Sequence, residues 1–465
     1  MTGESQQAVA DVRFVDCSVV TAEGELGSDV GVAVTDGKIV SVGAVDSLPE
    51  AHEEVRLDGE VLVPGIIDDH VHTRTPGHEY KEDWETATRA AAAGGITTVV
   101  AMPNTDPVID RVDRIESMYE TADADAIVDY LTHVVVTSEN LDRIPALGAA
   151  DIAGFKVFLG ITFGDIEAPT DGELHAAMQS IAETGRRLGF HEENDEIRAY
   201  LEAKFREEGK TDAIYHNRSR PPLAEVEAVS RVCLFSQYTD CPVHMFHLSS
   251  GSAAETLREW RHRGVDATAE TCPHYLWFTE DVVKERGTVA RVQPPLRTAD
   301  EVERLWSVGI DDGAVDCIAT DHAPHTDAEK GVDDPDKSVW ETPGGFVGLE
   351  TQVPAMLTFV GEGRLTLPEW VNLHSTRPAQ IWGMYPKKGS LQPGADADFT
   401  VVDPDREWTL DRTELHSKST ATPFDGEEFR GAVTKTVVRG EIVYDGETIT
   451  GDTGYGELAT GESLE

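Results

Sequence analysis

Two histidines one residue apart, His70 and His72, are the first residues in this sequence whose types and spacing could do chemistry. They end an apolar run, residues 61–67, that has the composition of a buried strand. Because side chains alternate between the two faces of a strand, both imidazoles would point to the same side. Two imidazoles on one face of a strand end can bind one metal ion, although two solvated histidines would show the same spacing.

Residues of the same chemical kind recur at the ends of other apolar runs. They are Lys156 in F-K-V-F, His191 after G-F, His244 and His247 in V-H-M-F-H-L-S-S, and Asp321 in C-I-A-T-D-H-A-P-H. In a barrel of parallel strands, residues at the carboxyl ends of different strands meet in one pocket. Several histidines and an aspartate that converge there form a metal-binding constellation. The joint pattern therefore predicts a metal site.

Lys156 is the unusual member of this set because an ammonium cannot bind a metal ion near neutral pH. A lone buried lysine beside cations would also be costly. If CO₂ carbamylates the amine, the side chain becomes a carboxylate that can bridge two metal ions. The alternative is a lysine whose charged end reaches the surface while its stem is buried.

The elements that must position these residues alternate along the chain. Residues 82–93 have the composition of a helix, Gly94 and Gly95 would end it, and residues 96–102 form an apolar run. Further apolar runs at residues 154–159, 243–248 and 314–319 are separated by helical stretches. This alternation predicts an α/β fold with a (β/α)₈ TIM-like barrel, and a doubly wound sheet is the alternative.

The two ends of the chain resemble each other in composition. Both contain alternating apolar segments, and Asp36-Gly37 indicates a hairpin turn in the first of them. Because chain ends often lie close together, we expect them to form one small β-sandwich domain. The predicted organisation is therefore a small β domain from residues 1–62 and 386–465 around a metal-dependent barrel of residues 63–385.

The chain has a net charge of −47, from 86 acidic and 39 basic residues. Such a surface repels phosphate groups, so we expect neither nucleic acid nor an anionic membrane as a partner. Self-repulsion of this size is tolerable when salt shortens the Debye length. We infer a halophilic protein from a salt-rich cytoplasm.

Segments for export or membrane insertion are not evident in the sequence. The amino-terminal residues lack the basic and apolar regions of a signal peptide, and no apolar run reaches the length of a membrane span. The 5 cysteines are odd in number and form no C-x-x-C, so we expect small buried thiols rather than structural disulfides. These features predict a soluble, cytoplasmic protein.

The stretches quoted above resemble the amidohydrolase superfamily, and the match covers nearly the whole chain. Four further stretches match the same superfamily: A-A-A-A-G-G-I-T-T-V-V-A-M-P-N-T, E-T-C-P-H-Y-L, Q-P-P-L-R and G-A-D-A-D. They are most similar to its cyclic-amide branch, which includes dihydroorotase, allantoinase and hydantoinase or dihydropyrimidinase. The resemblance implies a small cyclic amide as substrate, two divalent metal ions, and a homodimer or homotetramer. Zn²⁺ suits imidazole and carboxylate ligands, with Mn²⁺ or Co²⁺ as alternatives.

The resemblance also implies a role for each candidate ligand. His70 and His72 would bind the first metal ion, His191 and His247 the second, carbamylated Lys156 would bridge the two, and Asp321 would be both a ligand and the catalytic acid and base. His244 lies near His247 in the sequence. We prefer His247 because it precedes L-S-S, as the family's ligand precedes its own Ser/Thr pair.

Three further residues match those that hold the substrate carboxylate in dihydroorotase-like sequences: Arg74, Asn104 and His325. A guanidinium fork suits a carboxylate. The resemblance thus implies reversible cyclisation of N-carbamoyl-L-aspartate to dihydroorotate in pyrimidine biosynthesis.

Two departures from the dihydroorotase pattern keep other functions open. Gln293, which should contact the ring amide, stands where that pattern usually has Asn, and residues 208–222 resemble allantoinases and hydantoinases. An allantoinase or hydantoinase/dihydropyrimidinase is therefore the alternative. A non-catalytic scaffold protein is a remote one, because such proteins typically lose metal ligands.

Overall fold

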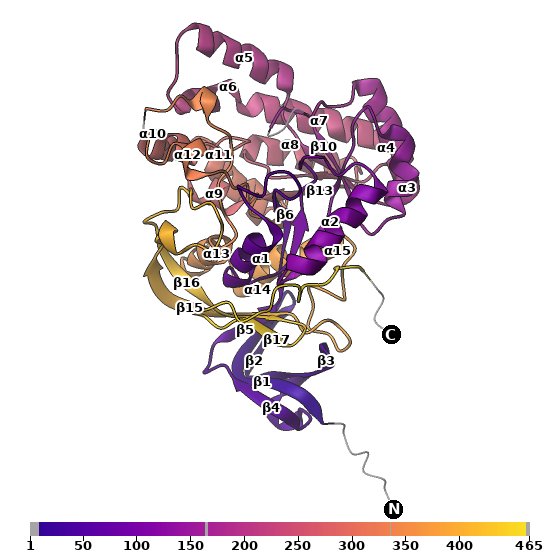
Figure 1. The fold of residues 1–465 in the computed structure, drawn as a ribbon, viewed down its shortest axis with the longest axis vertical. Helices are drawn as coiled ribbons and strands as arrows, with labels where there is room; N and C mark the ends of the chain where they lie inside the picture. Colours follow the sequence, from indigo (N-terminus) through magenta and orange to yellow (C-terminus); the bar gives the residue numbers. More distant parts are fainter. Residues whose placement is uncertain (1–8, 163–165, 335, 462–465) are drawn as a thin grey trace, which may run out of the picture.

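The computed structural model describes residues 9–162, 166–334 and 336–461. Figure 1 shows an α/β barrel with a β domain beneath it, and this β domain contains both the indigo N-terminal strands and the yellow C-terminal strands. The two ends of the chain therefore share one body, and the long middle segment forms the other.

Eight parallel strands among the described residues form the barrel. They are β6 (Ile66–Val71), β7 (Ile96–Ala101), β8 (Asp129–Thr132), β10 (Phe155–Phe158), β11 (Leu188–His191), β12 (Val243–Met245), β13 (Ala267–Thr271) and β14 (Cys317–Ile318). The short β9 (Val134–Val135) pairs with β10, and Val71 pairs with His322 just after β14, which joins the first strand to the last. The predicted (β/α)₈ TIM-like barrel is confirmed.

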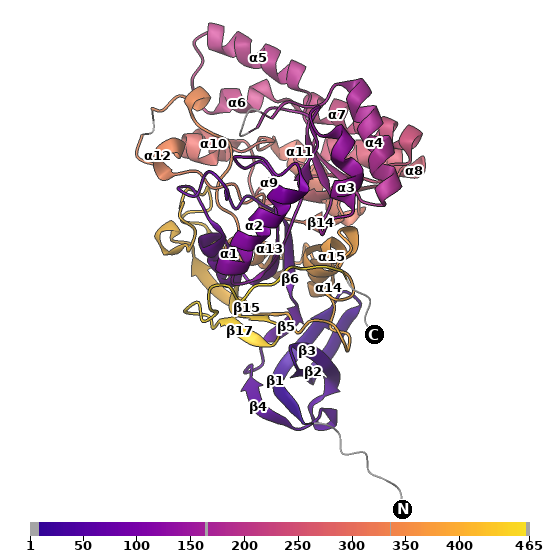
Figure 2. The same ribbon diagram turned by 45° about the vertical axis from the view of Figure 1, so that its right-hand side comes forward.

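Helices follow the barrel strands and lie around the outside of the barrel (Figure 2). The first half contains α1 (Trp84–Ala93), α2 (Val112–Asp125), α3 (Ile144–Gly148), α4 (Asp171–Thr184), α5 (Asp195–Glu207), α6 (Ile214–Ser219) and α7 (Pro222–Thr239). The second half contains α8 (Gly251–His262), α9 (Pro273–Trp277), α10 (Asp281–Arg286), α11 (Ala299–Arg304), α12 (Asp327–Lys330), α13 (Gln352–Gly361), α14 (Leu367–Val371) and α15 (Arg377–Ile381).

The first of these helices shows how local sequence sets an element's bounds. Asp83 caps α1 by accepting a hydrogen bond from the Thr86 backbone, and the Thr86 side chain accepts one from the Asp83 backbone in return. The alanine-rich helix ends at Gly94, and Gly95 follows with a φ of 84°. A Cβ at Gly95 would lie 2.8 Å from Thr400 Cγ2, so a glycine is needed where the chain enters β7.

Two predicted strands end earlier than the apolar runs indicated. β12 stops at Met245 and β14 at Ile318, whereas the runs continue to residues 248 and 319. The reason is backbone conformation, because His247 and Asp321 have φ values of 41° and 47°, outside the extended region. The chain therefore turns directly after each strand, and this turn points both side chains into the barrel mouth.

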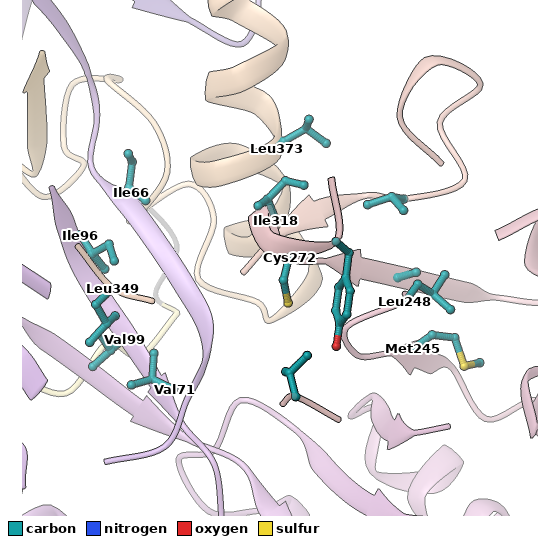
Figure 3. Close-up of a cluster of buried hydrophobic side chains, with 14 of the residues drawn as sticks. Ile66, Val71, Ile96, Val99, Met245, Leu248, Cys272, Ile318, Leu349 and Leu373 are labelled. Carbon is teal, nitrogen blue, oxygen red and sulfur yellow. The ribbon is translucent and has the colours of Figure 1, made fainter. Parts of the chain in front are cut away.

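The apolar core joins distant barrel strands into one cluster. Figure 3 shows Ile66 and Val71 from β6 in this cluster, and Met245 and Ile318 from β12 and β14 belong to it as well. Each of these side chains is buried. Burial of a side chain of this size contributes roughly 1.5–3 kcal/mol, so the cluster fixes the scaffold that carries the strand ends.

The β domain is one sheet with the strand order β17-β16-β15-β5-β1-β2-β3, and β4 pairs with β1. Its strands are β1 (Ala10–Thr21), β2 (Gly24–Thr35), β3 (Lys38–Ala44), β4 (Ala51–Arg56), β5 (Val61–Pro64), β15 (Phe399–Thr409), β16 (Glu428–Val438) and β17 (Glu441–Tyr444). Antiparallel pairing of β5 with β15 joins the two chain ends. The predicted β domain is confirmed, while its boundaries at residues 62 and 386 stay a prediction.

A buried lysine connects the β domain to the barrel. The Lys388 ammonium forms ion pairs with Asp396 at 2.8 Å, with Asp398 at 2.7 Å, and with Asp129 at the start of β8. These carboxylates raise the pKa of Lys388, although its burial alone would lower it. Three carboxylates so close together could hold a metal ion, but here the ammonium takes that place.

Lys388→Met is expected to lower the free energy of unfolding by about 3–5 kcal/mol, because three buried carboxylates would lose their shared cation. Urea unfolding at a fixed salt concentration, followed by circular dichroism, measures this change. Lys387→Met is the matched control, since the neighbouring Lys387 forms no ion pair among the described residues. Equal losses in the two variants would contradict the proposed role of the buried cluster.

All five cysteines lie among the residues that the structure describes, and each is a buried free thiol. Within the same residues, no helix combines the length and the apolar character that crossing a membrane requires.

Candidate active site

The carboxyl ends of the barrel strands gather the predicted ligands around one narrow pocket. His70 and His72 come from the end of β6, His191 ends β11, His247 follows β12, and Asp321 follows β14. All five line the pocket, together with Arg74, Asn104, Gln293, Phe158, Thr162, Ala323, Gly344 and Gly345. Lys156 lies inside β10 and is fully buried.

His70, His72 and Asp321 form the first half of the site. Asp321 Oδ1 lies 3.3 Å from His70 Nε2 and 3.2 Å from His72 Nε2. One carboxylate oxygen therefore faces two imidazole nitrogens from the same strand end. These three groups come close enough together to hold a single cation.

His191 and His247 form the second half. His191 Nδ1 lies 2.9 Å from His247 Nε2, and the two ring centroids are 4.7 Å apart. His191 Nε2 donates to Glu193 Oε2 at 2.9 Å, which leaves the Nδ1 lone pair facing His247. The rings are thus oriented to bind a second cation between them.

The opposite nitrogen of each ring is turned toward an oxygen in a different part of the fold. His70 Nδ1 lies 2.5 Å from Glu270 Oε1, and His72 Nδ1 lies 2.7 Å from Asn104 Oδ1. His247 Nδ1 is 4.0 Å from Glu192 Oε1. The hydrogen-bonded partners Glu270 and Asn104 fix the tautomer and the orientation of a metal-binding histidine, whereas the distance from His247 to Glu192 is too long for a hydrogen bond.

Burial keeps these imidazoles neutral. It holds the pKa of His70, His72 and His247 well below the ordinary value, and it lowers the pKa of His191 as well. A neutral imidazole has a lone pair that can bind a metal ion, whereas a protonated one does not. The protonation state of the four rings therefore suits metal binding.

Lys156 lies behind the two halves with its Nζ 3.7 Å from the centre of the Phe246 ring. Among the described residues, this Nζ has no hydrogen-bond partner. Burial lowers the pKa of Lys156 to about 8, with nearby carboxylates such as Glu270 acting in the opposite direction. An amine of that pKa is partly neutral at mildly alkaline pH, and the neutral amine is the form that reacts with CO₂.

Arg74 and His325 meet at one end of the pocket. Arg74 is 2% exposed, its Nε donates to the Pro324 carbonyl at 3.1 Å, and its guanidinium lies 3.3 Å from His325 Nε2. Lys81 Nζ donates to His325 Nδ1 at 3.0 Å, so the imidazole proton is on Nε2. Burial lowers the pKa of Arg74 to about 10, which leaves the guanidinium charged at neutral pH.

Asn104 lies between the histidines and this cationic end. Its Oδ1 faces His72 Nδ1, so the amide NH₂ group is available to donate to a bound molecule. Gln293 lines the same pocket and lies against Gly344, where an added Cβ would come within 2.7 Å of Gln293 Cγ. Arg74, Asn104 and Gln293 thus line one pocket. His325 contacts Arg74 but lies outside this lining, and its Nε2 donates to the Gly344 carbonyl at 3.1 Å.

The structure separates His244 from the other histidines. His244 Nδ1 contacts Thr268 Oγ1 at 2.8 Å, and its ring lies 5.1 Å from that of Trp382, away from the pocket lining. His247 lines the pocket instead. His247 has a left-handed backbone conformation after β12, whereas His244 lies within the strand.

Several residues around the site were missed by the sequence reasoning: Lys81, Phe158, Thr162, Glu192, Glu193 and Glu270. One signal could have found Glu270, because an acidic residue inside an apolar strand is as unusual as Lys156. Glu192 and Glu193 directly follow His191, which is a second such signal. Nothing in the sequence distinguishes Phe158 or Thr162.

Known proteins are similar to this chain in both sequence and fold. The model of the amidohydrolase family matches residues 61–443. A dihydroorotase of Geobacter sp. (strain M21) is 35% identical over 92% of this chain and 97% of its own length. An allantoinase of Solibacter usitatus is 35% identical over 94% of each chain.

Solved structures give the same result. The L-hydantoinase (dihydropyrimidinase) from Arthrobacter aurescens has a TM-score of 0.93 and 31% identity, over 97% of this chain and 100% of its own. A D-hydantoinase has a TM-score of 0.90 and 28% identity. The chain therefore belongs to the amidohydrolase family, in the branch that contains dihydroorotases, allantoinases and hydantoinases.

Proposed function

We propose that this enzyme is a dihydroorotase, which interconverts N-carbamoyl-L-aspartate and dihydroorotate in pyrimidine biosynthesis. The observation that carries the proposal is the buried Arg74 guanidinium in the pocket lining, next to His325. A guanidinium binds a carboxylate through two parallel hydrogen bonds, so it selects a substrate that carries one. The similarity to dihydroorotases at 35% identity supports this choice.

The same proposal includes two divalent metal ions, most simply Zn²⁺. His70, His72 and Asp321 would hold one, His191 and His247 the other, and carbamylated Lys156 would lie between them. The residues fit this role because neutral imidazole nitrogens face one another, and the buried Nζ of Lys156 has no hydrogen-bond partner among the described residues. When bound, such ions lower the pKa of water and polarise a carbonyl.

The chain's own side chains would perform the remaining steps. Asp321 takes the proton of the attacking water and gives it to the leaving ring nitrogen. Burial raises the pKa of Asp321 to about 8, so this carboxyl can hold a proton near neutral pH. Arg74, Asn104 and His325 hold the substrate carboxylate and thereby orient the scissile ring bond.

The alternative is a hydantoinase or an allantoinase, which act on other cyclic amides. The TM-score of 0.93 to an L-hydantoinase favours it, as does Gln293 at the ring-binding position. Arg74 favours the dihydroorotase proposal, because its guanidinium can pair with a substrate carboxylate, which neutral cyclic amides lack.

Turnover of three substrates side by side tests the proposal. The zinc-loaded protein in high salt is given dihydroorotate, allantoin and dihydrouracil. A clear preference for dihydroorotate is expected. Turnover of allantoin or dihydrouracil alone would leave the metal centre in place and show that this enzyme belongs with the allantoinases or hydantoinases.

Lys156→Arg is expected to reduce the bound metal from two ions per chain to one or fewer. Arginine keeps the positive charge, but it cannot be carbamylated and would repel both ions. Elemental analysis of the purified variant measures the metal content. Lys330→Arg, at another fully buried lysine that lies outside the pocket lining, is the control and should keep both ions. Two ions in Lys156→Arg would refute the bridging role.

We also infer a salt-rich cytoplasm as the milieu and a homodimer or homotetramer as the working form. The net charge of −47 supports the first inference. The melting temperature should rise between 0.1 and 3 M KCl, because salt screens the repulsion among acidic side chains. A melting temperature that falls over this range would contradict the inference, and light scattering measures the size of the assembly.

A further inference from the structure

We propose that Glu270 is a positioning residue that holds both halves of the metal centre in place, an inference that rests on the metal centre proposed above. Glu270 comes from β13, and its side chain is fully buried beneath the pocket. It does not line the pocket itself, so it would act through the histidines and not on the substrate.

The first contact of Glu270 fixes the His70 ring. Glu270 Oε1 lies 2.5 Å from His70 Nδ1. Burial and the neighbouring Asp69 raise the pKa of Glu270. When Glu270 is ionised it only accepts hydrogen bonds, so the proton of the neutral imidazole is then on Nδ1. The lone pair of Nε2 is therefore directed toward Asp321 and the pocket, which is the tautomer that binds a metal ion.

The second contact fixes the backbone that carries His247. The His247 backbone N–H donates to the same Glu270 Oε1 at 3.1 Å. His247 has a φ of 41°, a left-handed conformation that is strained for a residue with a side chain. The hydrogen bond helps to hold this turn, and the turn directs the His247 ring toward His191.

The neighbouring polar residues each support only one half of the centre. Asn104 contacts His72 in the first half. Glu193 contacts His191 in the second half and forms an ion pair with Arg220. Glu270 differs because one oxygen atom serves a ring in the first half and a backbone N–H in the second. Its loss should therefore weaken both halves together.

The second oxygen of Glu270 allows the charge and the hydrogen bonds to be separated experimentally. Oε2 lies 3.5 Å from His244 Nε2 and has no hydrogen-bond partner among the described residues. Glu270→Gln can keep an oxygen at the Oε1 position and put its NH₂ group at the Oε2 position. Glu270→Leu has a similar size but removes both hydrogen bonds.

The experiment titrates the metal-free full-length protein with Co²⁺ alone. Visible absorption reports binding at each half, elemental analysis counts the ions, and circular dichroism of the metal-free form checks the fold. We expect Glu270→Leu to lower the affinity for both ions by about 10–100-fold, the usual effect of losing a partner of a metal-binding histidine. Glu193→Gln should lower the affinity for one ion only. For both ions, the affinity of Glu270→Gln should fall between that of Glu270→Leu and that of the unchanged protein.

Four results would overturn the inference. One is wild-type affinity for both ions in Glu270→Leu, and another is the loss of only one ion in that variant. If Glu270→Leu does not fold, Glu270→Gln decides, and unchanged affinity at either half is the third result. Failure of the unaltered protein to bind Co²⁺ is the fourth, and it alone would also refute the proposed metal centre.

Discussion

Asp321→Asn is expected to lower the turnover number of the metal-loaded enzyme by about 10²- to 10⁴-fold, the usual contribution of a general acid and base. Asn has nearly the same shape as Asp and keeps an oxygen near His70 and His72. Its amide cannot accept the proton of the attacking water or return one to the leaving nitrogen. The effect should therefore appear in kcat, with bound metal largely retained.

Steady-state kinetics and metal analysis on the same preparation separate the two roles of Asp321. Asp312→Asn replaces an exposed carboxylate shortly before β14 and is the matched control, for which unchanged kinetics are expected. Turnover within a few-fold of the unaltered enzyme in Asp321→Asn would rule out the proton-transfer role. Loss of both metal ions would instead show that Asp321 acts mainly as a ligand.

Arg74→Met is expected to lower kcat/KM for dihydroorotate by roughly 100-fold, mostly through a higher KM. The variant keeps much of the side-chain length but loses a charge-assisted pair with the substrate carboxylate, and the loss of such a buried pair costs about 2–5 kcal/mol. Because Arg74 is 2% exposed and lines the pocket, water cannot replace the lost contacts well. For a neutral substrate such as dihydrouracil, kcat/KM should fall only a few-fold.

The comparison between charged and neutral substrates is the internal control for Arg74→Met. Arg89→Met, on the outer helix α1 and 38% exposed at its side chain, tests whether any loss of an arginine has the same effect. An unchanged KM for dihydroorotate in Arg74→Met would refute the carboxylate-binding role. Equal losses for dihydroorotate and dihydrouracil would indicate a distorted pocket instead.

Residues at strand ends were predictable from the sequence because their signal is local. An apolar run that ends in His or Asp marks both a buried strand and its functional end, as at His70, His191 and Asp321. The alternation of helices and strands predicted the barrel for the same reason. The ends of β12 and β14 were predicted less well, since positive φ values at His247 and Asp321 cannot be read from apolar composition.

The sequence by itself determined the barrel, the β domain from both chain ends, and the set of side chains at the strand ends. Only the tertiary structure decided what supports them. Glu270 meets His70 across 200 residues of chain, and Lys388 meets Asp129 across 259. Such contacts depend on strand register and on closure of the barrel, which local patterns of hydrophobicity and charge do not encode.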